Sequence, residues 1–407
     1  MAGPPVGLYV HVPFCLSICP YCDFVVHAGS DARGPRSRVP AYLRAVRTEI
    51  ELRADVLDDR FGPPGATGRP ALETLYLGGG TPSLLPAADV AALIELVRER
   101  FGLAAGTEIT LEANPGPSER GDLAAFADAG VTRLSVGAQA LEASTLRRLG
   151  RRHAPSDVTD TVAEARAAGI GSVGLDLLYD LPGQTVAGWA ATLEAALDLR
   201  PEHLSLYALG LDDPDAEGLT EAGGDHLPVR PGARRWRDRA RAGQDEDRAA
   251  AMYEHAVDHL QAAGFRGYEI SNWARPGHES RHNLAYWRRL PVEAVGPGAH
   301  AFDGETRRWN AARLETYLAA LVPPSGRPPS LPPGGSERLA PSAARAETIV
   351  LGLRTAEGIS ARAASEAAVE AGLRWGIEHA LLVERSGRLA LTTTGRLLSN
   401  ELFARLV

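Results

Sequence analysis

Short apolar runs alternate with longer amphipathic stretches over the first half of the chain. Runs rich in β-branched and other apolar residues predict strands, and apolar positions with a period near 3.6 predict helices. The predicted strands are residues 8–14, 74–78, 108–113, 133–138, 172–179 and 203–209. The predicted helices between them lie near residues 40–55, 87–100, 118–129, 156–168 and 186–199. This order predicts an α/β fold with a parallel sheet and crossover helices.

Polar side chains and glycines recur where these predicted strands end. They are the cysteine-rich segment, the triplet Gly78-Gly79-Gly80, Glu112, Gln139 and Asp176. The carboxyl ends of parallel strands meet on one face of a barrel, and the sites of βα barrels lie there. We therefore expect a partial (β/α)6 barrel over residues 1–210 with its site on that face.

The pattern changes after residue 210. Residues 212–247 are rich in Gly, Asp, Arg and Pro and are expected to be irregular, whereas a helix is predicted near residues 248–263. Both segments belong to an elongated extension over residues 211–322. The run "PPSGRPPSLPP" predicts a proline-rich linker over residues 323–344.

The tail, residues 345–407, predicts three helices, a small hairpin and a final helix. The hairpin lies in "LVERSGRLALT", with Ser386 and Gly387 at its turn. This order is typical of a small winged-helix-like α+β domain. The tail's helices carry as many acidic as basic side chains, so we expect packing against the barrel rather than DNA contact.

Composition narrows the class of protein further. The chain has 407 residues, of which 44% are hydrophobic, enough for a large core. No apolar run approaches the roughly 18 residues of a membrane span, and no signal peptide is recognisable, so we expect a cytoplasmic location. A net charge of −8 argues against nucleic-acid binding. The sequence contains no lysine, which excludes a Walker lysine and a Schiff-base lysine.

The three cysteines, Cys15, Cys19 and Cys22, lie within eight positions. An odd number at this spacing does not suit a disulfide framework and predicts metal ligands. Thiolates bind iron–sulfur clusters, and a [4Fe–4S] cube held by three thiolates keeps one iron open. The alternative is a Cys3His zinc site completed by His11 or His27, which is disfavoured because structural zinc motifs usually consist of two separated ligand pairs.

Several motifs extend the cysteine pattern along the chain. They are "HVPFCLSICPYCDF", "LYLGGGTPSLL", "ITLEANPG", "RLSVGAQAL", "LDLLYDLPGQT", "YEISNWARPGHESRHNLAYW" and "GPGAHAF". Together they resemble the radical S-adenosylmethionine (SAM) superfamily, its oxygen-independent coproporphyrinogen III oxidase (HemN) family and, more closely, the heme-chaperone branch of that family. The resemblance covers nearly the whole chain.

The resemblance implies a radical SAM barrel and the cofactors it uses. SAM would chelate the open iron through its amino and carboxylate groups, and an electron donor such as a flavodoxin or ferredoxin would reduce the cluster, so that SAM is cleaved to a 5′-deoxyadenosyl radical. The family positions that contact SAM correspond here to Tyr9, Tyr21, Gly79, Gly80, Thr81, Glu112, Gln139, Arg151 and Asp176. At Asp180 this chain departs from the family's usual glycine.

The residues themselves support part of this assignment. The glycine triplet permits close backbone approach to a ligand, although a tight βα turn explains it equally well. Glu112 is either a ligand-facing carboxylate or the acidic residue of a helix N-terminus. Asp176 lies in an apolar strand and needs a partner, for which Arg151 is a candidate, either in a structural ion pair or as part of a shared ligand clamp.

The segment "PGHESRHNLAYWRR" brings His278, His282, Asn283, Tyr286 and Trp287 together. His and Tyr ligate heme iron, and aromatic rings offer flat area to a porphyrin. Taken alone, such a cluster is more often a packed surface segment, but its H-N-x-x-Y-W pattern resembles the heme-chaperone branch and implies heme contacts at His282, Asn283, Tyr286 and Trp287. Nearby Arg281, Arg288 and Arg289 could pair with propionates, and His300 is a weaker second candidate.

Three functions follow from these features. The leading one is a heme chaperone that binds heme beside a SAM-ligated cluster and transfers it to a heme-accepting protein, with a peripheral contact to membrane proteins as a further expectation. The alternative is an oxidative decarboxylase of coproporphyrinogen III, and the weakest is a zinc- or DNA-binding regulator. Decarboxylases carry a further cysteine where Phe24 stands here and a longer arm before Cys15, so decarboxylase activity is not expected. Against the chaperone branch, Ser280 stands where the family often has a cysteine.

Overall fold

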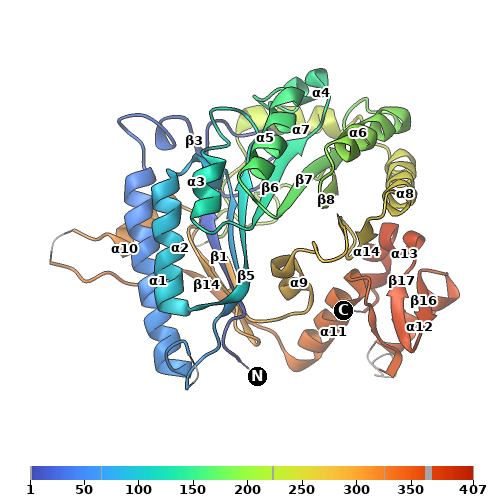
Figure 1. The fold of residues 1–407 in the computed structure, drawn as a ribbon. Coiled ribbons are helices and arrows are strands. Elements are labelled where there is room, and N and C mark those ends of the chain that lie inside the picture. The colour runs from blue at the N-terminus through green and yellow to red at the C-terminus, as the bar shows by residue number, and fades with distance from the viewer. Residues whose placement is uncertain (1, 66, 222–223, 325, 363–368, 407) are drawn as a thin grey trace.

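A mixed sheet forms the centre of the protein (Figure 1). The computed structural model describes residues 2–65, 67–221, 224–324, 326–362 and 369–406. Successive parallel strands of the sheet are β1 (Gly7–Val12), β4 (Leu72–Gly79), β5 (Leu103–Ala113), β6 (Arg133–Gln139), β7 (Ser172–Tyr179) and β8 (His203–Ala208). They correspond to the predicted strands and lie side by side in chain order. The prediction of a partial (β/α)6 barrel is confirmed.

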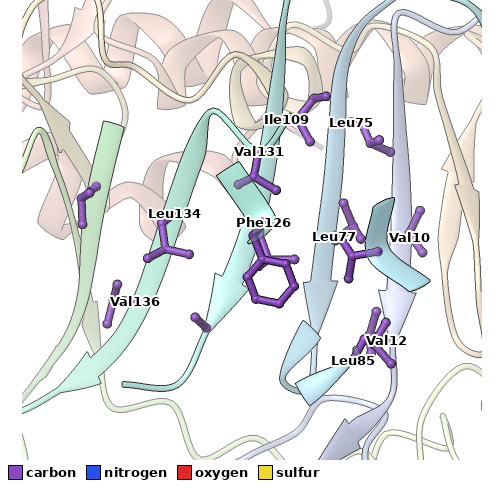
Figure 2. Close-up of a cluster of buried hydrophobic side chains, with 14 of the residues drawn as sticks. Val10, Val12, Leu75, Leu77, Leu85, Ile109, Phe126, Val131, Leu134 and Val136 are labelled. Carbon is purple, nitrogen blue, oxygen red and sulfur yellow. The ribbon is translucent and has the colours of Figure 1, made fainter. Parts of the chain in front are cut away.

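Alternate side chains of these strands face opposite sides of the sheet, because the side-chain period of a strand is two. One side is apolar and packs under the crossover helices. Figure 2 shows members of this core on successive strands, Val10, Leu77, Ile109, Leu134 and Val136, with Phe126 from the helix side packed among them. The other side carries polar residues at the intervening positions, among them Thr110, Glu112, Ser135 and Asp176. The same strands therefore build the core and one wall of the site.

The crossover helices pack their apolar residues against this core. They are α1 (Val39–Phe61), α2 (Ala87–Phe101), α3 (Leu123–Asp128), α5 (Pro155–Ala167) and α6 (Val186–Asp198), followed later by α8 (Glu246–Ala262). The helix predicted near residues 40–55 continues until Gly62, whose φ of 81° ends it. The helix predicted at residues 118–129 is shorter, because Asp122 caps it by accepting a hydrogen bond from the Ala125 amide at 3.0 Å.

The extension and the segment predicted as a linker add strands to both edges of the barrel sheet. Beside β1 lie β11 (Val292–Val295), β12 (His300–Phe302), β13 (Thr306–Asn310) and β14 (Gly334–Arg338), and beside β8 lie β10 (Asn272–Ala274) and β9 (Arg266–Gly267). Strand β14 pairs with β13 along its whole length. The segment predicted as a linker, residues 323–344, therefore contains a strand of the sheet and the first turn of α11 (Pro341–Arg354).

Several shorter elements lie outside these strands and crossover helices. They are β2 (Phe14–Cys15), β3 (His27–Ala28), α4 (Ala143–Arg148), α7 (Pro231–Arg241), α9 (Arg281–Trp287) and α10 (Leu314–Leu321). The parallel pair β2 and β3 brackets the loop that carries the cysteines. Helix α7 lies inside the segment predicted to be irregular, so that prediction is wrong for residues 231–241.

The C-terminal elements group together and have a core of their own (Figure 1). They are α11 (Pro341–Arg354), β15 (Ile359–Ser360), α12 (Glu370–Glu378), β16 (Leu382–Arg385), β17 (Arg388–Leu391), α13 (Thr393–Leu397) and α14 (Ser399–Phe403). The predicted hairpin forms between β16 and β17, whereas residues 363–368 of the predicted helical part lie outside the described residues. Ion pairs such as Arg289–Glu347 and Arg288–Glu357, both at 2.6 Å, connect this group to the extension.

Within the described ranges, no helix is both long enough and apolar enough to cross a membrane.

Candidate cofactor site

A cavity of about 410 Å³ opens at the carboxyl ends of the parallel strands. Predicted site residues that line it are Cys15, Cys19, Tyr21, Cys22, Gly79, Gly80, Glu112, Gln139, Arg151, Asp176 and Asn283. Residues from seven separate stretches of the sequence thus meet in one space. The C-terminal location expected for a barrel site is the observed one.

The cysteine loop forms one wall of this cavity. Thr81 Oγ1 donates to Cys15 Sγ at 3.4 Å, and Arg151 Nη1 lies 3.8 Å from Cys19 Sγ. Burial raises the pKa of the Cys15 thiol to about 11, and burial together with the neighbouring thiols raises the pKa of Cys22 further. Thiols crowded in this way ionise readily only beside a cation, which iron would supply. The donor set therefore fits an iron–sulfur cluster.

The same geometry does not suit a zinc ion. Four ligands around one zinc, with Zn–S bonds of about 2.3 Å, bring sulfurs within about 4 Å of one another. Within the part of the chain that the structure describes, no three His, Cys, Asp or Glu side chains lie close enough to hold a single metal ion. Both ring nitrogens of His11 are engaged, with Tyr9 Oη at 3.1 Å and the Val25 carbonyl at 2.8 Å. A cube separates its thiolate ligands more widely than one zinc ion does, so the cluster is the better fit.

The glycine triplet lies where β4 meets the cysteine loop. A Cβ on Gly80 would come within 2.7 Å of the Phe14 carbonyl oxygen, and Gly79 has a φ of 112°. Both positions therefore require glycine for backbone reasons. The Gly79 amide donates to Glu112 Oε2 at 2.8 Å, so this N–H is engaged by the protein itself.

Glu112 lies within β5 and faces the cavity, so the alternative of an acidic residue at a helix N-terminus is wrong. Its other oxygen, Oε1, accepts a hydrogen bond from Tyr76 Oη at 2.8 Å. Removal from bulk water raises the pKa of Glu112 from 4.5 to about 7, despite these two hydrogen bonds. The carboxyl group is thus poised to ionise when a cation arrives.

Asp176 is the second carboxyl group in the cavity. It accepts hydrogen bonds from Ser135 Oγ at 3.0 and 3.2 Å, and removal from water raises its pKa. The alternative in which Arg151 forms a structural ion pair with Asp176 is wrong, whereas a shared ligand clamp stays a prediction. Arg151 donates to Asn114 Oδ1 at 2.5 Å and to the Gly137 carbonyl at 2.6 Å, because its guanidinium points toward the cysteine loop.

Neither Glu112 nor Asp176 forms an ion pair with another described residue. Two enclosed carboxyl groups without a cationic partner fit a ligand that carries positive charge. SAM brings a sulfonium cation and an amino group that can donate hydrogen bonds, so the residues present fit SAM. Tyr21 Oη and Arg151 Nε are removed from solvent and have no hydrogen-bond partner within the described part of the chain, so they add further unused polar groups at the same site.

The remaining predicted SAM residues differ in position. Gln139 lines the cavity with a φ of 64°, next to a register shift between β6 and β7, and such strain is common at functional sites. Tyr9 and Thr81 do not line the cavity. They contact residues of the site through hydrogen bonds, Tyr9 to His11 and Thr81 to Cys15. Sequence analysis missed several polar lining residues, namely Asn114, Arg133, Ser135, His203, Ser205 and Tyr207. The two-residue spacing of the strand residues, and the position of Asn114 two residues after Glu112, were the available signal.

The HNxxYW segment folds as α9. The Arg281 and His282 amides donate to Glu108 at 3.1 Å, and Ser280 Oγ accepts from the Asn283 amide at 3.3 Å, so both acidic and hydroxyl groups cap the helix. Asn283 lines the cavity and the Tyr286 side chain is 37% exposed. The segment therefore adjoins the site through part of its residues.

His282 is only 1% exposed and uses both ring nitrogens. Nδ1 lies 2.8 Å from Thr74 Oγ1 and Nε2 lies 2.9 Å from Tyr286 Oη. Burial lowers its pKa to about 3, so the imidazole is neutral. In this arrangement neither nitrogen is available to heme iron.

Other residues expected to contact heme also have partners within the protein. The three arginines expected to pair with propionates instead contact Glu73, Glu357 and Glu347. The guanidinium of Arg354 lies 4.4 Å over the Trp287 ring. The side chain of His300 is more exposed to solvent. It stacks on Trp309 and contacts Asp225 through Nε2 at 2.9 Å.

Comparisons with known proteins agree with this fold and site. The sequence profile of the Radical SAM superfamily matches residues 9–196, which contain all of the predicted cluster and SAM residues. Fold and site thus define a radical SAM protein. The chain is 38% identical to "Heme chaperone HemW" of Mycobacterium tuberculosis over 403 residues, which is 98% of this chain and 94% of that protein. It is 36% identical to the protein of the same name from Escherichia coli K12, over 73% of this chain and 70% of that one.

Among solved structures, the fold is similar to coproporphyrinogen III oxidase (HemN) from Escherichia coli. The TM-score is 0.78 at 21% identity, over 99% of this chain and 90% of that chain. At this identity the likeness shows the fold alone. The similarity along the full sequence carries the assignment, and the chain belongs to the HemW family of radical SAM proteins. The resemblance found in the sequence is confirmed.

Proposed function

We propose that this protein is a heme chaperone, which binds heme beside a SAM-ligated [4Fe–4S] cluster and transfers the heme to an acceptor protein. The observation that carries this proposal is the likeness, along 98% of the chain, to proteins named heme chaperone HemW. Phe24 supports it from within the site. This side chain is 62% exposed at the rim of the cavity, where the decarboxylase pattern has a further cysteine.

In this proposal Cys15, Cys19 and Cys22 would hold three irons, and the chain would orient SAM at the fourth. Glu112 and Asp176 would face its sulfonium and amino groups, while Arg151 keeps the Cys19 side of the loop in place. When bound, the cluster and SAM supply one-electron chemistry. The sheet and its helices exclude bulk water from the strand ends, which strengthens each of these electrostatic contacts.

Heme contact is proposed at the rim of the cavity and at the HNxxYW segment. The aromatic side chains of Phe24 and Tyr207 line the cavity and are 62% and 41% exposed, and such rings suit the flat apolar face of a porphyrin. Asn283 of α9 also lines the cavity, and Tyr286 lies on the same helix. Coordination by His282 would require Nε2 to give up its hydrogen bond to Tyr286.

The partners follow from this function. A heme-accepting protein is required, and a flavodoxin or ferredoxin is the proposed electron donor. A cytoplasmic location, a peripheral contact with membrane proteins and the absence of nucleic-acid binding stay predictions.

One experiment separates the chaperone from the decarboxylase. The protein is reconstituted anaerobically with iron and sulfide, its iron is counted, and its EPR spectrum is recorded with and without SAM. We expect one [4Fe–4S] cluster whose signal changes with SAM, binding of about one heme per chain in a Soret titration, and no decarboxylation of coproporphyrinogen III. A genuine coproporphyrinogen III oxidase serves as the positive control in the last assay. Formation of vinyl groups would overturn the chaperone proposal, as would the absence of heme binding.

A further inference from the structure

Helix α7 brings a buried arginine to the cysteine loop. It lies beside α4 (Figure 1), where Trp236 Nε1 donates to the Arg148 carbonyl at 3.1 Å. Arg237 lies on the inward face of α7 and is only 4% exposed. The side chain reaches across to the backbone that joins the second and third cysteines.

The Arg237 guanidinium donates to four backbone carbonyls. Nε donates to Pro20 at 3.1 Å, and Nη2 donates to Tyr21 at 3.2 Å and to Cys22 at 3.0 Å. Nη1 donates to the carbonyl of Asp212, just after β8. Three consecutive residues of the cysteine loop are thus held by one rigid, planar group, a geometry that a lysine cannot reproduce.

The charge of Arg237 has no counterion among the residues that the structure describes. No carboxylate among the described residues forms an ion pair with it, although buried charges are usually paired. Its neighbours are neutral carbonyl groups, which offset only part of the cost of burial. The missing negative charge would come from the cysteine thiolates that adjoin these carbonyls.

Helix α7 is anchored without Arg237. Arg234 forms ion pairs with Asp213 and Asp215, and Arg241 donates to the Leu211 carbonyl at 2.7 Å. Ala240 packs in a small apolar cluster with Leu149, Leu181 and Leu209. The position of the helix is therefore fixed by other contacts, and Arg237 is free to act on the loop.

We propose that Arg237 is a positioning residue for the iron–sulfur cluster, which fixes the backbone from Pro20 to Cys22 and places a permanent positive charge beside the thiolates. The proposal rests on the proposed cluster. Reduction adds negative charge to a cluster, and a fixed cation stabilises the reduced form, so Arg237 raises the reduction potential. The clamp on the backbone also slows the loss of iron.

Two substitutions separate the charge from the clamp. Arg237→Gln keeps a hydrogen-bond donor but removes both the charge and the planar set of guanidinium donors. Arg237→Lys keeps the charge and removes only the planar set of donors. Arg235→Gln is the matched control, because Arg235 is on the same helix, is exposed and contacts no other described residue in a hydrogen bond or ion pair. Circular dichroism checks that each variant folds.

The first readout uses the protein before reconstitution. Amide hydrogen exchange of residues 19–23 should be faster in both Arg237 variants than in Arg235→Gln and the wild type, because the carbonyls of this loop lose their donor. The second readout is the midpoint potential of the reconstituted cluster in an EPR-monitored titration. It should fall in Arg237→Gln and stay close to the wild-type value in Arg237→Lys. The third is iron release to a chelator, which should be about tenfold faster in both Arg237 variants.

The outcomes are distinct. Wild-type exchange, potential and iron release in Arg237→Gln would overturn the proposal, and an equal fall in potential for the Lys variant would overturn its electrostatic part. If Arg237→Gln does not fold, the exchange and iron release of Arg237→Lys decide on the clamp. A wild-type protein that assembles no cluster would contradict the proposed function, while the exchange measurement would still test the clamp.

Discussion

Replacing Glu112 by glutamine should stabilise the ligand-free protein and weaken its binding of SAM. Glutamine keeps the shape of the side chain. The carbonyl oxygen of the glutamine can accept from the Gly79 amide, and its amide group can donate to Tyr76 Oη. The Tyr76 hydroxyl then acts as an acceptor instead of a donor, which a hydroxyl group can do. The substitution therefore removes a charge without leaving a polar group unpaired.

The effect on stability follows from the raised pKa. In the unfolded chain the carboxyl group ionises near 4.5, whereas in the folded protein its pKa is about 7. Below pH 4.5 both states are protonated, and the folded state carries no penalty. Between pH 4.5 and 7 the unfolded state loses its proton first, so stability falls as pH rises. The difference between the two pKa values, at 1.36 kcal/mol per pH unit, corresponds to a penalty of up to about 3 kcal/mol above pH 7. Glu112→Gln removes this penalty.

The effect on SAM has the opposite sign. A hydrogen bond between an ionised and a neutral or cationic group contributes about 1.5–3 kcal/mol, so loss of the carboxylate should weaken SAM binding about 10- to 100-fold at pH 8. Wild-type affinity should also fall as pH decreases below 7, because SAM must then displace the Glu112 proton. The variant lacks this dependence on pH.

The assays are thermal unfolding of the ligand-free protein at pH 5 and pH 8, and SAM titration of the reconstituted protein over pH 6–8. We expect the two proteins to have similar Tm values at pH 5 and the variant to be more stable at pH 8. Asp180→Asn serves as a control for removal of a carboxylate, because Asp180 lies outside the cavity and pairs with Arg248 at 2.6 Å. A lower Tm for Glu112→Gln at pH 8 together with unchanged SAM affinity would refute the reasoning and make Glu112 a structural residue.

Three further predictions concern other parts of the chain. Cys22→Ala should abolish the iron content after reconstitution, and retained iron would contradict the three-thiolate cluster. Tyr286→Phe removes the hydrogen bond that occupies Nε2 of His282, so heme affinity should rise about fivefold if this nitrogen ligates heme, whereas an unchanged Soret titration would exclude His282 as the ligand. The full chain should show no sequence-selective gel shift with DNA, since its C-terminal elements direct acidic residues such as Glu347 and Glu357 into ion pairs with the extension; a salt-dependent, selective shift would contradict this.

The barrel and most of the cavity could be predicted because their signals are local. A short apolar run in the sequence predicts each strand. Gly79, Glu112 and Asp176 lie within or just after such runs, so they could be predicted as site residues. Asp180, where this chain departs from the usual glycine, is explained by its backbone conformation and its partner. Its φ of 53° explains why glycine is usual at this position, and its contact with Arg248 shows how this chain retains an aspartate there.

The partners of these residues could not be predicted in the same way. Arg151 seemed the natural partner for Asp176, since both are charged and belong to the same expected site. In the structure the guanidinium turns toward Cys19 and Asn114, and Ser135 on the neighbouring strand meets Asp176. Charge alone does not decide between these arrangements, because the direction of each side chain depends on the register between strands. His282 is a similar case, since its two hydrogen bonds depend on how α9 packs against β4.

Helix α7 marks a different limit of sequence reasoning. Its abundance of Arg, Gly and Asp predicts irregular structure, and the inward position at Arg237 breaks the apolar pattern that would have indicated a helix. The residue is buried because its partners are backbone carbonyls, one of them 215 positions earlier in the chain. Backbone acceptors are the same whatever the side chain, so they leave no mark in the sequence. A buried arginine of this kind can be recognised only when the loop it holds is already in place, and here that loop is the one that carries the cysteines.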